Sequence, residues 1–228
     1  MKYFGNELGG LHKEMGSIIR KKGRFEEARL MFFRLHSQLH SGSVYGLGET
    51  EYDRLLSELS DDNFRLRPQK DEDTIIWNLW HISRIEDITA GFLLSGEGQL
   101  FSPEIKEKMH SLIADTGNAM TEDEVTAFSK SISVPRLLRY RDDVGKRTRE
   151  IISQLSESDM KRKFTAEHRE RILMSGGVVS HPESEWLADF WTQKDAAGII
   201  LMPLTRHQLL HLNQCGKIKS ELTHQSKK

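Results

Sequence analysis

Four long segments of this 228-residue chain repeat apolar residues with the period of an α-helix. They cover residues 25–40, 73–94, 135–154 and 195–222. The alternation that marks strands is nearly absent, and residues 174–180 give the only strand signal, a weak one. Four amphipathic helices with so little strand pattern predict an all-α fold, a four-helix bundle around one core.

The connections between these segments differ in length and character. Residues 96–133 form a long, mixed connection with short helices expected at 103–114 and 121–130, which permits a crossover between the second and third long helices rather than a simple up-and-down topology. Residues 157–192 are expected to be irregular. Pro203 lies inside the last segment and should kink that helix or mark its true start.

Composition narrows the class of protein. Residues 1–24 are polar, glycine-dotted and basic, which predicts an N-terminal arm or short helix, and residues 25–228 are expected to form one bundle domain.

The net charge of −1 argues against a nucleic-acid binder. No apolar run approaches a membrane span, and no secretory signal is expected. The single cysteine, Cys215, cannot form an intrachain disulfide, which favours the cytoplasm.

Two histidines stand one helical turn apart in the middle of the last apolar stripe. His207 and His211 share this face with five apolar or weakly polar residues, Ile200, Leu204, Cys215, Ile218 and Leu222. A third histidine, His81, is on the inward face of the second long helix. A bundle can bring these faces together, and three neutral imidazoles would hold a divalent metal while leaving a position for water or substrate.

A simpler interpretation remains open, because an inward histidine is more often a hydrogen-bonded core residue than a ligand. His36 and His40 repeat the same spacing, but they fall on the flank of the first helix and are expected to be solvated or interfacial. Cys215 is expected to be a small buried apolar group. The zinc-protease motif with two histidines and a glutamate, the glycine-rich phosphate loops and the serine-hydrolase elbow are all absent.

The neighbours of His81 divide into two sets. Ser83, Arg84 and Asp87 are predicted on the opposite, outward side of that helix. Asn78 and Glu86 are candidates for supporting a metal ligand by their proximity in the sequence, although Glu86 could equally be a surface charge beside Arg84.

At these residues the sequence resembles the DinB-like superfamily of metal-binding four-helix bundles, which includes the bacillithiol and mycothiol S-transferases. The stretches that carry the resemblance are WNLWHISRIEDIT, RYRDDVGKRTREII, DFWTQKDAAG and LTRHQLLHLNQCGKI. They place His81 in the family's helix-two position and supply its C-terminal histidine pair. The resemblance covers roughly residues 25–222.

This resemblance implies zinc or nickel bound by His81, His207 and His211, with water completing the coordination. It also implies a long crossover between helices two and three, and a homodimer. Relatives bring a low-molecular-weight thiol to the metal and transfer it to a small electrophile. Gln214 stands where many relatives carry an acidic residue, so no general acid or base is named.

Two functions follow as hypotheses. The first is a metal-dependent transferase of the thiol S-transferase type or a related detoxification or stress protein. The second is a non-catalytic, dimeric helical binding module whose histidines are structural core residues.

Overall fold

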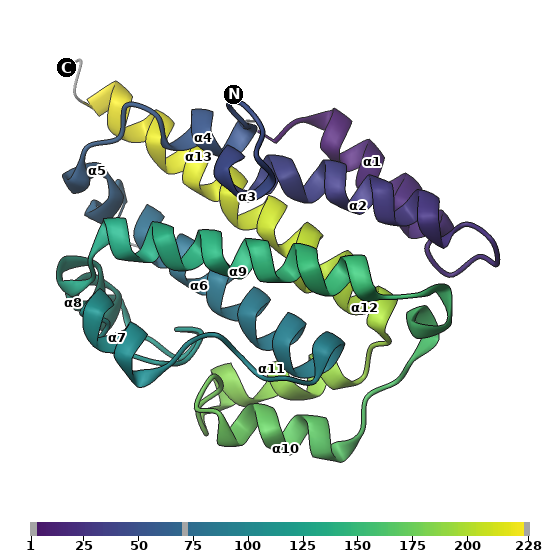
Figure 1. Cartoon of the computed structure of the whole chain (residues 1–228). Helices are drawn as coiled ribbons and strands as arrows, with labels where there is room; N and C mark the ends of the chain where they lie inside the picture. Colours follow the sequence, from purple (N-terminus) through teal and green to yellow (C-terminus); the bar gives the residue numbers. More distant parts are fainter. Residues whose placement is uncertain (1–3, 70–72, 226–228) are drawn as a thin grey trace.

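The structure of the chain, a computed structural model, describes residues 4–69 and 73–225 (Figure 1). All regular elements among these residues are helices, and the only β-type pairing is an isolated bridge between Lys163 and Asp195. The predicted all-α class is therefore confirmed. The strand signal at residues 174–180 was wrong, because these residues contain the end of one helix and the turn that follows it.

Four long helices lie together around a shared core (Figure 1). They are α2 (Phe25–Leu39), α6 (Ile75–Ile88), α9 (Val134–Gln154) and α13 (His207–Gln225). Helix α6 packs against both α9 and α13, and α2 packs against α9 and α13 as well. Each of the four matches a segment that the helical period predicted, although α9 begins one residue earlier and α13 ends three residues later than expected. The apolar pattern of each segment therefore predicts the main helices of the molecule.

Helix α6 is buried around its whole circumference, and every residue from Ile75 to Ile88 is buried. The expectation that Ser83, Arg84 and Asp87 face solvent was therefore wrong. The reason lies in the connection between α6 and α9, which contains α7 (Pro103–Met109) and α8 (Glu122–Ser131). This connection covers the side of α6 that a bare bundle would leave exposed.

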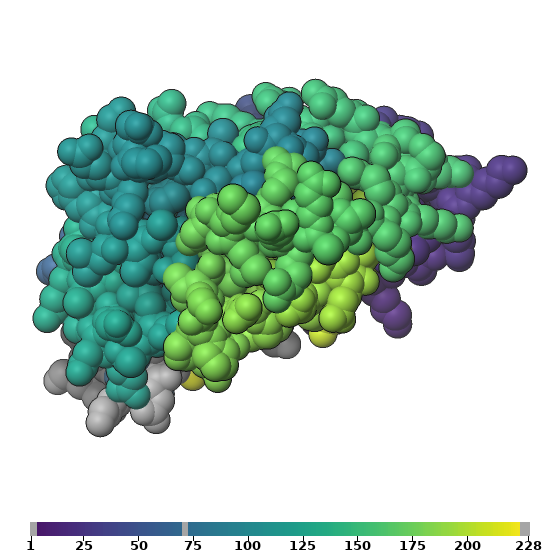
Figure 2. Space-filling view, turned by 90° about the horizontal axis from the view of Figure 1, so that it is seen from below, coloured from purple at the N-terminus to yellow at the C-terminus, as the bar shows by residue number. Residues whose placement is uncertain are grey.

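The region expected to be irregular contains two further helices, α10 (Ala166–Met174) and α11 (Pro182–Thr192), which pack on each other, and a short 3₁₀ turn, η2 (Glu157–Lys161). A start signal was present, because the His181 side chain accepts a bond from the backbone of Glu183 and Pro182 occupies the first helical turn. In Figure 2 the light green surface of α10 and α11 covers the middle of one face, beside the teal connection between α6 and α9.

The last segment is interrupted at Pro203, as predicted. Helix α12 (Ala196–Leu201) passes into a π-helical turn, η3 (Met202–Arg206), before α13 begins. Proline has no backbone N–H, so it cannot continue the regular helical ladder. The turn matters for function because His207 is the first residue of α13.

Smaller helices complete the fold. Helix α1 (Asn6–Ile18) packs on α2 and buries Leu8, Met15 and Ile18 in the common core. The short helices α3 (Gly42–Tyr45), α4 (Glu51–Leu56) and α5 (Asp61–Arg65) link α2 to α6. A second π-helical turn, η1 (Thr89–Ser95), extends α6. Within the described ranges, none of these helices combines the length and apolar character needed to cross a membrane.

Candidate metal centre

The structure brings His81 of α6 together with His207 and His211 of α13. The ring centroids lie 5.0 Å apart for His81 and His207, 4.7 Å for His81 and His211, and 4.5 Å for His207 and His211. One nitrogen from each ring lies within 4.8 Å of the others. The predicted metal site required histidines from two distant segments to lie close together, and in the structure they do.

Two of these rings are held in one tautomer by their outer nitrogens. Nδ1 of His81 lies 2.8 Å from the carbonyl oxygen of Thr116, which can only accept, so this nitrogen donates. Nδ1 of His211 lies 2.7 Å from Oδ1 of Asn78. The Asn78 amide is oriented by its own bond, in which Nδ2 donates to the carbonyl of Thr74 at 2.9 Å. The Nε2 atoms of His81 and His211 consequently carry lone pairs.

With the third ring, His207, the triad has a nitrogen lone pair without a hydrogen-bond donor, and a bound cation could accept it. Nε2 of His207 lies 3.2 Å from Nε2 of His81, and its buried Nδ1 has no hydrogen-bond partner among the described residues. A neutral His207 carries one N–H, whereas His81 and His211 both present acceptor lone pairs. At least one acceptor therefore lacks a donor within the triad, while one divalent ion could accept all three lone pairs. The residues fit a metal.

Burial keeps the three rings in the form that binds metals. Desolvation lowers the pKa of His81 to about 4 and that of His211 to about 3, and the pKa of His207 lies well below its usual value. The neighbouring imidazoles also oppose protonation of His207 and His211. All three rings are therefore neutral at pH 7, as ligation requires.

The turn that holds His81 is itself fixed. The backbone N–H of Thr116 donates to the carbonyl of Gly177 at 3.1 Å, and Nε1 of Trp80 donates to the carbonyl of Asp115 at 2.9 Å. Gly117 adopts a φ of +80°, and a Cβ placed there would lie 2.9 Å from Nε1 of Trp77. This position therefore favours glycine for both its backbone conformation and its lack of space.

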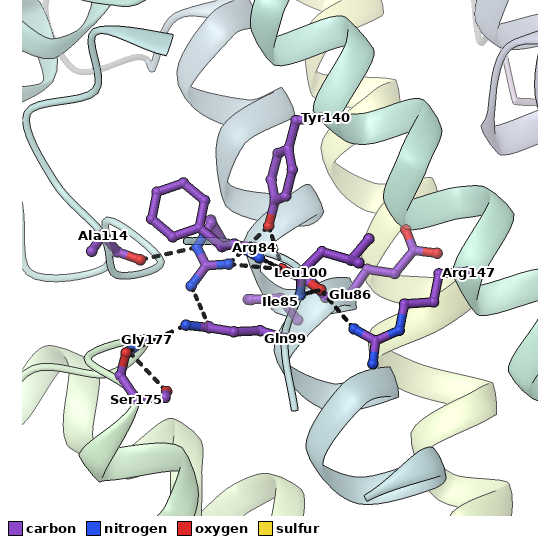
Figure 3. Close-up of polar contacts among 12 residues, drawn as sticks. Arg84, Ile85, Glu86, Gln99, Leu100, Ala114, Tyr140, Arg147, Ser175 and Gly177 are labelled. Carbon is purple, nitrogen blue, oxygen red and sulfur yellow. Dashed lines mark hydrogen bonds and ion pairs between the residues drawn. The ribbon is translucent and has the colours of Figure 1, made fainter. Parts of the chain in front are cut away.

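A buried ion pair anchors the same connection to α6 (Figure 3). Arg84 pairs with Asp87 at 3.1 Å and donates to the hydroxyl of Tyr140 at 2.8 Å and the carbonyl of Ala114 at 2.9 Å. Asp87 in turn accepts the backbone N–H of Leu100 at 2.7 Å. From the sequence, Arg84 and Asp87 were expected to face solvent, and this role was not predicted. Their opposite charges three residues apart indicated that they could pair, but not that the pair would be buried.

A cavity of about 340 Å³ opens onto the three histidines. Its walls include the aromatic rings of Trp77, Trp186, Phe190 and Trp191, and Trp77 stacks on His81 with centroids 4.8 Å apart. The described residues place no Lys, Arg, Asp or Glu on this lining. A ligand at the histidines would therefore sit in an apolar pocket with few polar partners beyond the imidazoles and Asn118.

A comparison with protein families agrees with this geometry. Residues 47–215 match the DinB superfamily, and this range includes all three histidines. The chain belongs to the DinB superfamily. No curated protein matches it.

Three other candidate residues of this DinB-superfamily chain have different surroundings. Cys215 is fully buried and burial raises the pKa of its thiol to about 12, so it is an unreactive apolar group, as predicted. Asn78 supports His211, whereas the buried Glu86 contacts His36, His40 and Gln208 among the described residues. The interpretation of Glu86 as a surface charge was wrong, because it is paired with two other histidines.

Those partners are His36 and His40, which were expected to be solvated or interfacial. Both are fully buried. His36 lies near the end of α2 and His40 is its C-cap residue; Tyr45 of α3 contacts His36, and Gly145 of α9 faces His40. The helical period showed that they lie off the main apolar stripe, but it could not show which other elements would cover them.

Proposed function

We propose that His81, His207 and His211 bind one divalent transition metal, zinc or nickel, and that the protein is a metal-dependent transferase of the thiol S-transferase type. The observation that carries this proposal is the pair of tautomer-locked rings, whose Nε2 lone pairs converge with His207 beside a cavity. Membership of the DinB superfamily supports it, since relatives bind a divalent metal through a histidine triad.

The protein's own groups would do two things, and a bound metal would supply a third. Thr116 and Asn78 hold the His81 and His211 rings so that their Nε2 atoms remain directed at one point. The aromatic walls exclude water and lower the local dielectric constant. A bound metal would lower the pKa of a thiol that reaches it, so that the thiolate is available as nucleophile at neutral pH.

The substrates follow from the lining as a further part of the proposal. A low-molecular-weight thiol would bring its sulfur to the histidines, and the electrophile would be a small, uncharged molecule with an apolar or aromatic surface. The uncharged walls of the 340 Å³ cavity favour such a partner over an anion or a cation. No lining carboxylate is available as general base, which agrees with Gln214 in place of an acidic residue.

The finer architecture belongs to the same proposal. Helices α2, α6, α9 and α13 would be the four helices of a DinB bundle, with α7 and α8 in a crossover between the second and the third. We also propose a homodimer in the cytoplasm. The domain boundary expected near residue 25 remains a prediction.

Metal analysis tests the central claim. The untagged protein should retain one metal equivalent that is lost in His81→Ala and in His211→Ala, and thiol transfer to a small aromatic electrophile should disappear with it. His110→Asn is the matched control, because His110 is exposed and asparagine tolerates its φ of 55°. If both triad variants keep the full metal content of the wild type, the triad is not the site. The non-catalytic module with structural histidines would then be the better function.

A further inference from the structure

A second group of potential ligands is buried between α2 and α6, away from the cavity. His36 lies on α2, His40 is the C-cap residue that follows the last residue of that helix, and Glu86 comes from α6. Nε2 of His36 lies 2.8 Å from Oε1 of Glu86, and Nε2 of His40 lies 3.1 Å from Oε2. All three side chains are fully buried. His36 and His40 precede the part of the chain that matches the DinB superfamily, so the match does not account for this group.

The spacing of these atoms suits coordination. Two ligands bound about 2.1 Å from one ion and at right angles to each other lie about 3.0 Å apart. The separations of 2.8 Å and 3.1 Å fall on either side of that value. One nitrogen from each ring and one carboxylate oxygen also lie within 4.8 Å of one another.

His40 provides an independent indication. Neither of its ring nitrogens has a hydrogen-bond partner among the described residues, although the ring is fully buried. Its Nε2 faces Glu86 without the geometry of a hydrogen bond. A buried imidazole without a bonded nitrogen is rare, and a ligand would satisfy it.

The buried negative charge of Glu86 also favours a bound cation. Glu86 accepts bonds from Nε2 of His36 at 2.8 Å and from Nε2 of Gln208 at 2.7 Å, and Gln208 is neutral. Arg141 reaches Gln208 and Ser83 rather than Glu86. A cation within the group would compensate the buried carboxylate.

Neighbouring residues orient both rings as they would around an ion. The hydroxyl of Tyr45 lies 2.7 Å from Nδ1 of His36, on the side away from Glu86. Gly145 of α9 faces His40, and a Cβ there would lie 2.6 Å from Nδ1. The absence of a side chain at Gly145 therefore lets α9 approach the ring closely.

From this geometry we propose that His36, His40 and Glu86 form a second metal site, which takes a divalent first-row transition ion. The ion connects α2 to α6 and has a structural role, since its ligands are inaccessible to solvent. Imidazole and carboxylate ligands together select ions of intermediate softness, such as Zn²⁺, Fe²⁺ or Co²⁺. Access requires opening of the short α3 segment, whose Tyr45 covers His36.

The test uses Co²⁺ with the full-length chain and measures bound metal after desalting, with the visible absorption of the Co²⁺ complex. A His207→Ala/His211→Ala variant removes the first site and should keep about one equivalent. Adding Glu86→Gln, which preserves the shape of the side chain, should remove that equivalent. Glu150→Gln, an exposed change on α9, is the matched control and should leave it unchanged.

The outcomes separate the two proposals. A folded His207→Ala/His211→Ala protein that binds no Co²⁺ overturns the second site and leaves the first intact. If it keeps every equivalent of the wild type, the first site fails and the second stands, provided that Glu86→Gln then releases metal. Retention of metal by a folded triple variant also overturns the second site. If Glu86→Gln does not fold, His36→Gln in the same background replaces it, and the readout is the rise in Tm that Co²⁺ causes. Loss of this rise supports the second site, and an unchanged rise contradicts it.

Discussion

Nδ1 of His211 donates a hydrogen bond to Oδ1 of Asn78 at 2.7 Å, and this bond joins α13 to α6 at the candidate metal centre. Asn78 lies one turn before His81 on α6, so one short stretch of helix supplies a ring to the triad and orients another. The amide of Asn78 is fixed in turn by the carbonyl of Thr74. The position of the metal ligands therefore depends on a chain of hydrogen bonds that leads back to the start of α6.

We predict that Asn78→Ala weakens metal binding about 10- to 100-fold, because the His211 ring loses the bond that sets its tautomer and orientation. Asn78→Asp should retain most of the affinity, since its carboxylate accepts the same bond. Competition with a chromophoric chelator measures both. The control is Asn213→Ala, an amide on α13 that bonds to the backbone of Leu209 and Phe4 rather than to the triad. Equal affinities for Asn78→Ala and the wild type would contradict the role given to Asn78.

The turn behind His81 gives a second prediction. Gly117→Ala should lower both the free energy of unfolding and the metal affinity, because its φ of +80° is strained for alanine and the new Cβ meets Trp77. The matched control is Gly176→Ala, which has a φ of +70° but open space around the Cβ. Backbone strain alone costs about 1–2 kcal/mol, so both variants should lose this much in urea unfolding. Only Gly117→Ala should also lose metal affinity. A similar loss of affinity in Gly176→Ala would contradict the explanation that the contact between the new Cβ and Trp77 causes it.

The triad was predictable because its signals are local. His207 and His211 stand in the middle of an apolar stripe, and His81 occupies an inward position on another helix, so each face could be identified from helical geometry alone. The resemblance to DinB-like sequences then indicated that the two faces meet. The carbonyl of Thr116, which orients the His81 ring, could not be placed in the same way, because the connection after α6 has no regular period.

The errors have a common physical cause. Arg84, Asp87, His36 and His40 were expected to be exposed or peripheral, and Glu86 either to support a metal ligand or to be a surface charge; all five are buried. Charged and imidazole side chains are usually exposed. Here they are buried because they have partners: Arg84 pairs with Asp87 within α6, and Glu86 pairs with His36 and His40 from a distant segment. A sequence pattern records the apolar stripe of one helix, but not which loops and short helices will cover its other side.

The Arg84 and Asp87 pair yields a third prediction. Asp87→Asn should lower the free energy of unfolding by about 3–5 kcal/mol, because it leaves the fully buried Arg84 guanidinium without its counter-charge. Tyr140→Phe removes one hydroxyl from the same network and should cost only about 1–2 kcal/mol. Urea unfolding of the metal-free proteins measures both values. A loss in Asp87→Asn no larger than that in Tyr140→Phe would show that the charge of Asp87 contributes little.

The fourth prediction concerns pH. In the metal-free protein burial lowers the pKa of His81 from 6.5 to about 4, whereas the unfolded chain has the ordinary value. Between these two values the unfolded state binds a proton that the folded state does not, so the free energy of unfolding falls as pH decreases from 6.5 towards 4. This ring contributes up to about 3 kcal/mol to that loss. Urea unfolding in a chelator at pH 7, 6 and 5 should show this dependence of the free energy of unfolding on pH. In His81→Asn the slope should be shallower, because close to one proton fewer is taken up on unfolding. Parallel profiles for the wild type and His81→Asn would mean that His81 is not held neutral by burial.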